Sequence, residues 1–208
     1  MIYAVDHVVR AVSISEREAV AGELLGQGLR DIPLHLEFPE IGAASDSYAT
    51  AAGSFVELVY ETRPGDAPAA WFDETPRVIG LGFSSDDFEF DIAPWVDMRG
   101  AWTMDEDHEL ADGSVLNIRA AGPHPHFEGF YVFVMDRPEG LPYAELRADG
   151  RLASLTFEGG EAAEWRRRLN DWLRLPSTDA GLRAGDVALR FRSGSHPGVR
   201  VAPVLEPS

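Results

Sequence analysis

The chain has 208 residues, with 18 basic and 35 acidic side chains, so its formal net charge at pH 7 is −17. Every basic residue is Arg, and the absence of Lys and Cys excludes a Schiff-base lysine, a cysteine nucleophile, a disulfide framework and a cysteine-ligated zinc. This negative charge argues against nucleic acid and anionic membranes as partners, because both attract basic surfaces.

Three similar apolar segments open three units along the chain. They begin at Tyr3, Arg77 and Arg151, and these positions are evenly spaced. A fixed period with the same type of element indicates internal duplication.

A helix signal follows each opening segment. Ser15 and Glu18 resemble a capping box at the start of a first helix. Residues 84–87 can cap a short second helix, which Pro94 limits. Apolar residues at helical spacing over 162–173 predict a third helix.

Strand-like segments follow each helix. They comprise 45–52 and 54–61 in the first unit, 100–105, 114–120 and 129–136 in the second, and 186–192 and 199–205 in the third. We therefore predict an α+β protein of βαβββ modules over residues 1–62 and 77–136, with a shortened βαββ module over 147–208.

His7 and Glu57 are the candidate functional pair. His7 shares a strand face with Val9, whereas Asp6 is expected to point the other way. Glu57 shares a face with Phe55, so both ionisable groups face apolar surroundings, where charge is unfavourable unless it is paired or metal-bound. Imidazole and carboxylate together suit Zn, Fe, Mn, Co or Ni. Alternatively, the two side chains simply pair with each other.

The runs DHVV at residues 6–9 and FVELV at 55–59 resemble the vicinal oxygen chelate (VOC) superfamily, and in particular its glyoxalase-like branch, the glyoxalase/bleomycin resistance/dioxygenase fold. The resemblance implies curled mixed sheets that enclose one cavity. It also implies that His7 and Glu57 occupy the positions of divalent-metal ligands. The superfamily includes isomerases, epimerases, dioxygenases and metal-free proteins that sequester antibiotics.

The other two units lack the corresponding ligands. At equal offsets the second unit has Leu81 and Tyr131, and the third has Leu155 and Leu205. None of these side chains replaces an imidazole–carboxylate pair on a metal. A duplicated four-ligand site is therefore absent.

His124 and His126 alternate with proline, which favours an extended backbone with both imidazoles on one side. Members of the glyoxalase-like branch often carry a His-Pro step here, so the resemblance implies that His126 completes a metal site with His7 and Glu57. Alternatively, His124 and His126 are exposed on a surface loop. His35, His108 and His196 lie in polar contexts typical of surface residues, and we interpret the acidic run 105–109 as a solvated loop.

Three functions remain open. The first is a cavity protein that sequesters or modifies an aromatic or cationic metabolite. The second is a metal-dependent lyase, isomerase or oxygenase. The third is a metal-free enzyme that uses His7 and Glu57 as an acid–base pair. The residues expected to contact the ligand are Tyr48, Phe55, Trp102, His124 and Tyr131.

No apolar run approaches the roughly 20 residues that cross a bilayer, and the N-terminal residues lack the pattern of a signal peptide. We therefore expect a cytoplasmic protein with a small-molecule ligand and no membrane partner. Two arrangements of the units are expected. Either units one and two close the cavity and residues 137–208 complete a second half or a homodimer interface, or unit three pairs with unit one and the middle unit is an elaboration.

Overall fold

The computed structural model describes residues 4–63, 65–96, 98–109, 113, 115–123, 129–136 and 146–207. Its first unit contains β1 (Ala4–Ala11), α1 (Arg17–Gly26), β2 (Arg30–Phe38), the 3-10 turn η1 (Pro39–Ile41), β3 (Ala43–Ala49) and β4 (Phe55–Glu61). The second contains α2 (Ala69–Phe72), β5 (Arg77–Ser85), α3 (Phe88–Ile92), β6 (Trp102–Glu109), β7 (Val115–Gly122) and β8 (Tyr131–Asp136). The third contains β9 (Gly150–Gly159), α4 (Ala162–Leu173), β10 (Ser177–Thr178), β11 (Gly181–Ala184), β12 (Val187–Arg192) and β13 (Val199–Pro207).

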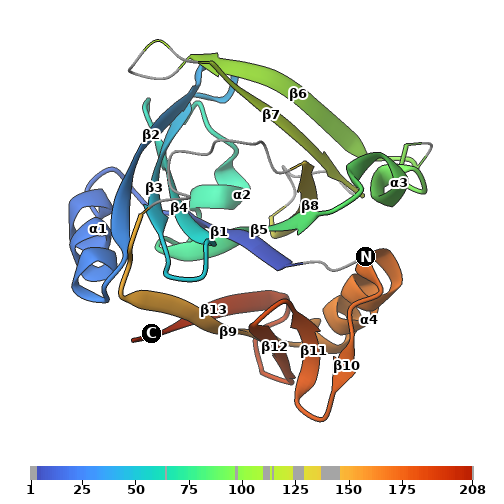
Figure 1. Ribbon diagram of the computed structural model, residues 1–208. Coiled ribbons are helices and arrows are strands. Elements are labelled where there is room, and N and C mark those ends of the chain that lie inside the picture. Colours follow the sequence, from blue (N-terminus) through green and yellow to red (C-terminus); the bar gives the residue numbers. More distant parts are fainter. Residues whose placement is uncertain are drawn as a thin grey trace.

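The first two units share one curled sheet. Its eight strands follow the order β2-β3-β4-β1-β5-β8-β7-β6. Within each unit the first strand is parallel to the fourth, as in β1–β4 and β5–β8, and the antiparallel pair β1–β5 joins the units. The sheet bends until its edge strands β2 and β6 lie on the same side of the molecule (Figure 1). The predicted α+β class with curled mixed sheets is confirmed.

The third unit forms a separate sheet with the order β10-β11-β12-β9-β13. It lies below β1 and β5 in Figure 1, with α4 beside it. The sequence predicted only two strands after the helix of this unit. Two more follow α4, because the short strands β10 and β11 precede β12. Strand β13 pairs antiparallel with β9, as β5 does with β1.

Apolar side chains divide into one layer inside the curl and two outside it. Outside, Phe83 of β5 packs in one core with Phe157 of β9 and Trp165 of α4. Also outside, Leu24 of α1 packs with Leu58 of β4. The core inside the curl is incompletely filled, and its residues line the cavity described below. Among the described residues, no helix is long and apolar enough to cross a membrane.

Two local features of the first unit differ from the sequence expectation. Just before α1, the carboxylate of Glu16 accepts hydrogen bonds from the backbone N–H and the hydroxyl of Ser13, at 3.0 and 2.7 Å. Ser15 and Glu18 form no capping box. Strand β2 was missed because its exposed positions are charged and it contains Pro33. An edge strand tolerates a proline, and the register between β2 and β3 shifts at this point.

Candidate functional site

His7 and Glu57 meet on the inner face of the curled sheet. Strand β1 runs parallel to β4, and Val9 is the partner of Glu57 while His7 is the partner of Phe55. The His7 Nε2 atom lies 3.5 Å from Oε2 of Glu57, and both side chains are largely buried. The His7 ring stacks on Phe55 with 4.4 Å between the ring centroids. The structure therefore brings together the two side chains on which the sequence argument depends.

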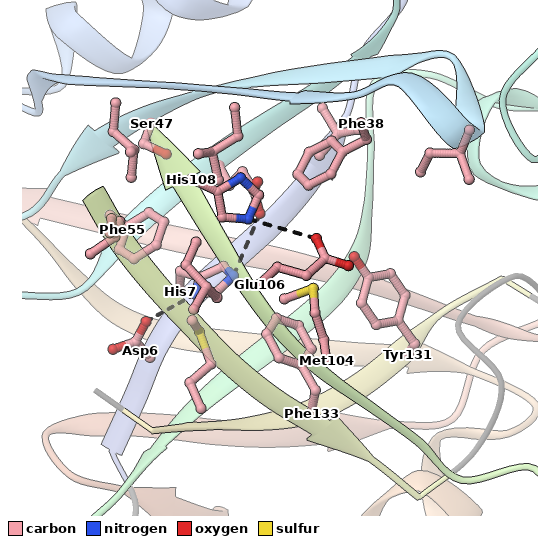
Figure 2. A pocket seen from close by; sticks show the side chains of 18 of the residues that line it. Asp6, His7, Phe38, Ser47, Phe55, Met104, Glu106, His108, Tyr131 and Phe133 are labelled. Atoms are coloured by element: carbon pink, nitrogen blue, oxygen red, sulfur yellow. Dashed lines mark hydrogen bonds and ion pairs between the residues drawn. The ribbon is translucent and has the colours of Figure 1, made fainter. Parts of the chain in front are cut away.

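Asp6 also reaches this pair, contrary to our expectation. Its Oδ2 lies 3.0 Å from Nδ1 of His7, and the side chain is buried (Figure 2). The register between β1 and β5 shifts between Val5 and His7. Such a β-bulge redirects a side chain that strict alternation would send to the opposite face. The result is a buried row in which one imidazole lies between two carboxylates.

The two carboxylates keep the His7 imidazole protonated. Burial by itself would lower the pKa of this ring, but hydrogen bonds and charge interactions with Asp6 and Glu57 outweigh that effect and raise the pKa to about 9. His7 is therefore an imidazolium at neutral pH. Nearby, burial and the charge of Glu57 raise the pKa of Tyr131 well above its usual value, so its phenol stays neutral.

Two glycines of β5 leave room for these rings. A Cβ atom on Gly82 would lie 2.8 Å from two atoms of the His7 ring, and one on Gly80 would lie 2.7 Å from the ring of Tyr131. The inner face of β5 is therefore free of side chains where β1 and β8 place their aromatic groups. We did not foresee this role from the Gly80-Leu81-Gly82 sequence.

Replacing Gly82 with Ala is expected to destabilise the protein by about 1–3 kcal/mol, the usual cost of overpacking a filled core. The two carboxylates restrain the His7 ring, so it cannot move away easily. Chemical denaturation measures the change. Gly22→Ala is the matched control, since nothing lies within 4 Å of its Cβ and Ala is the better helix former. Equal stability of the Gly82→Ala variant and the wild type would contradict the proposed packing of His7.

The row of Asp6, His7 and Glu57 lies at one wall of a cavity of about 480 Å³. This volume is typical of small-molecule sites. Apolar side chains dominate the lining, which includes six aromatic rings: Phe38, Phe55, Trp71, Trp102, Tyr131 and Phe133. Trp71 comes from α2 and stacks on Tyr131 with centroids 5.8 Å apart. The cavity therefore offers flat apolar walls next to one buried ionic row.

Three of the predicted ligand contacts line this cavity, namely Phe55, Trp102 and Tyr131. A fourth predicted contact, Tyr48, does not line it. Tyr48 packs outside the curl in the core beneath α1. Because side chains alternate along a strand, its neighbour Ser47 occupies the inward position instead.

The predicted residues His124 and His126 lie outside the described residues, and so do positions 125, 127 and 128 between β7 and β8. The structure therefore neither supports nor contradicts a ligand-binding role for either histidine.

His108 is a cavity residue that we had placed on the surface. The acidic run 105–109 is part of strand β6 rather than a loop, and alternation directs Trp102, Met104, Glu106 and His108 to the cavity. The His108 side chain is only 13% exposed, and its Nε2 lies 3.8 Å from Oε2 of Glu106 (Figure 2). The alternation of 102, 104, 106 and 108 was visible in the sequence, but the high local charge obscured it. His35 does lie at the surface, next to Asp46.

The described residues do not fit a divalent metal held by several side chains. Strands β5 and β8, which correspond to β1 and β4 in the second unit, present Gly80, Gly82, Tyr131, Phe133 and Met135 to the cavity, and none of these is an imidazole or carboxylate ligand. Nδ1 of His7 faces Asp6, and Nε2 faces Glu57 at 3.5 Å, so β1 and β4 supply only one imidazole–carboxylate pair for Nε2. No group of three His, Asp or Glu side chains suitable for a metal occurs within the described part of the chain.

The sequence offset aligned Leu81 of the second unit with His7, but Leu81 does not line the cavity. Leu81 faces the third unit in the outer core.

No family model matches the chain, and no curated protein matches it. Solved structures do. A hypothetical protein from Staphylococcus aureus is 9% identical with a TM-score of 0.71, and the match covers 99% of this chain and 92% of that one. A variant of 4-hydroxymandelate synthase from Streptomyces coelicolor, a VOC protein, is 14% identical with a TM-score of 0.58, over 97% of this chain and 63% of that one. The identities are low, but both matches cover nearly all of this chain, and the protein has the fold of the vicinal oxygen chelate superfamily.

Proposed function

We propose that the protein is a small-molecule-binding, cytoplasmic member of the glyoxalase-like branch, and that its cavity binds an organic cation with an aromatic or other flat apolar body. The binding both sequesters the molecule and shields it from water. The observation that carries this proposal is the charge of the cavity. Two acidic side chains, Asp6 and Glu57, lie beside the single imidazole of His7, and all three line a largely apolar cavity.

No described Arg lines the cavity, whereas Glu40 and Glu106 add two further acidic side chains to its wall. Acidic side chains are costly to bury in an apolar site without a positively charged partner. A bound monocation would remove that cost. The six aromatic rings also favour a cation, because the face of each ring is electron-rich. The net charge of −17 attracts such a ligand over longer distances.

Two enzymatic alternatives make different demands on the same residues. Metal-dependent catalysis by His7, Glu57 and His126 would require His7 to lose its proton and its contact with Glu57. Metal-free acid–base catalysis needs only a proton exchange between His7 and Glu57, which already lie 3.5 Å apart. The raised pKa of His7 makes it a weak acid at neutral pH, which favours binding over proton transfer.

The test compares benzyltrimethylammonium with neopentylbenzene, which has the same shape and no charge. We expect the cation to bind at least about tenfold more tightly, from cation–π contacts and from the acidic side chains of the cavity wall. Quenching of tryptophan fluorescence can report binding, because Trp71 and Trp102 line the cavity. Dialysis against a chelator is expected to leave the affinity unchanged.

Equal affinity for the two compounds would overturn the proposal. Cation binding that disappears on chelation would instead favour the metal-dependent alternative.

A further inference from the structure

Charge is divided unevenly along this chain. Residues 147–208 contain 10 Arg and 8 acidic side chains, so their formal net charge is +2. Residues 1–146 contain 8 Arg and 27 acidic side chains, so their formal net charge is −19. The third unit is therefore the basic part of a strongly acidic protein, and its surface attracts partners of the opposite charge.

Four arginines of the third sheet lie on one exposed face, which we call the Arg face. Arg190 and Arg192 alternate along β12, and Arg192 and Arg200 both lie opposite Glu158 of β9. Residues that alternate along a strand, or that lie directly opposite each other, share one face of a sheet. By the same register, β11 adds the fourth arginine, Arg183. Glu158 is the acidic residue between them.

The Arg face points away from the rest of the molecule. The other face of the same strands carries Leu155, Phe157 and Leu189, which are fully buried in the core that includes β5 and α4. The guanidinium groups of Arg190 and Arg192 are exposed and have no ion-pair partner within the described residues. Planar guanidinium groups bind carboxylates through two parallel hydrogen bonds, so this face is suited to an acidic partner.

A complementary acidic surface lies at the other end of the molecule. The edge strands β2 and β6 border a hollow of about 650 Å³. Its lining includes four acidic side chains that pair with no arginine of the described residues, and we call these the acidic pole: Asp31, Glu37, Asp107 and Glu109. Figure 1 shows β2 and β6 on the side opposite the third sheet. The acidic pole of a molecule therefore lies far from its own Arg face.

We propose that the Arg face binds the acidic pole of a second copy of this chain. Every copy carries both surfaces, and their charges are complementary. The contact is head-to-tail, so it forms a ring if the rotation between copies closes and an open chain if it does not. At physiological ionic strength, charges separated by more than about 8 Å are largely screened, which reduces the repulsion between two acidic molecules more than the attraction at the contact. This inference does not depend on what the cavity binds.

Sedimentation velocity at physiological ionic strength tests the contact. The wild type is expected to form larger species as its concentration rises. One double variant, Arg190→Glu with Arg192→Glu, reverses the Arg face, and another, Glu37→Arg with Glu109→Arg, reverses the acidic pole. Each should self-associate at least about tenfold more weakly than the wild type, because like charges then meet at the contact. None of these four residues lines the main cavity.

An equimolar mixture of the two variants should form a one-to-one complex that grows no further. The first variant keeps its acidic pole and the second keeps its Arg face, so the pair retains one intact contact. The matched control is Arg147→Glu with Arg166→Glu, which changes the net charge as much as the Arg-face variant does. Arg147 precedes β9, and Arg166 belongs to α4, which packs on the other face of the sheet. This control should self-associate like the wild type.

A wild type that stays monomeric at every concentration, or a mixture that contains only folded monomers, would overturn the proposal. So would a control that weakens association as much as the Arg-face variant, because net charge alone would then explain the effect. Binding of polyglutamate by a monomeric wild type would assign the Arg face to a different acidic partner and would also overturn it. Far-UV circular dichroism verifies that each variant is folded.

Discussion

In a Glu57→Gln variant, the cavity is expected to lose its preference for benzyltrimethylammonium over neopentylbenzene. Of the two carboxylates beside His7, Glu57 is the more exposed, with 12% of its side chain accessible against 3% for Asp6, which bonds to the Nδ1 side of His7. Its neutralisation removes the more accessible of the two acidic groups beside His7. We expect the affinity for the cation to fall about ten- to a hundredfold, as for the loss of a charged partner, while the affinity for the neutral compound changes by less than about twofold.

Glu106→Gln is the control for this experiment. Glu106 also lines the cavity, but 58% of its side chain is exposed, so water and salt screen its charge. Its effect on cation affinity should stay below about threefold at physiological ionic strength. A Glu57→Gln variant that still prefers the cation would show that the buried carboxylate does not determine selectivity, and the charge argument would be abandoned. Far-UV circular dichroism checks that both variants are folded.

The second large expected effect is a loss of folding stability at alkaline pH. The pKa of His7 is about 9 in the folded protein and about 6.5 in an unfolded chain, so the folded state holds its proton more tightly. The resulting stabilisation is fully present below about pH 6.5 and is lost as the pH rises through 9. The shift corresponds to about 3 kcal/mol, since one pKa unit corresponds to about 1.4 kcal/mol.

Urea denaturation of the wild type and of His7→Gln at pH 6, 8 and 9.5 measures this contribution. Titrating groups away from the site affect both proteins alike, so the difference between them reports the group of Asp6, His7 and Glu57. The wild type should lose about 3 kcal/mol more than the variant between pH 6 and 9.5. Parallel pH profiles would show that His7 is not held as an imidazolium between Asp6 and Glu57.

Alternation along the strands explains which parts of the site were predictable. His7, Phe55 and Glu57 carry strong local signals, because an ionisable residue between apolar neighbours on one strand face is conspicuous. Tyr48 was placed on the wrong face because the register of β3 is set by its pairing with β4 rather than by its own sequence. A shift of one residue exchanges Tyr48 for Ser47 and reverses which side chain faces the cavity.

Local periodicity and spacing in the sequence determined the α+β class and the repeated strand–helix–strand units, and the resemblance to the vicinal oxygen chelate superfamily pointed to the pair His7 and Glu57. Only the tertiary structure decided that Asp6 turns toward His7, that His108 faces inward and that Gly82 leaves room for an imidazole. The bulge, the curl of the sheet and the approach of β5 to β1 arise from contacts between distant segments. No local pattern records such contacts, so the charge balance of the cavity became apparent only when the strands were assembled.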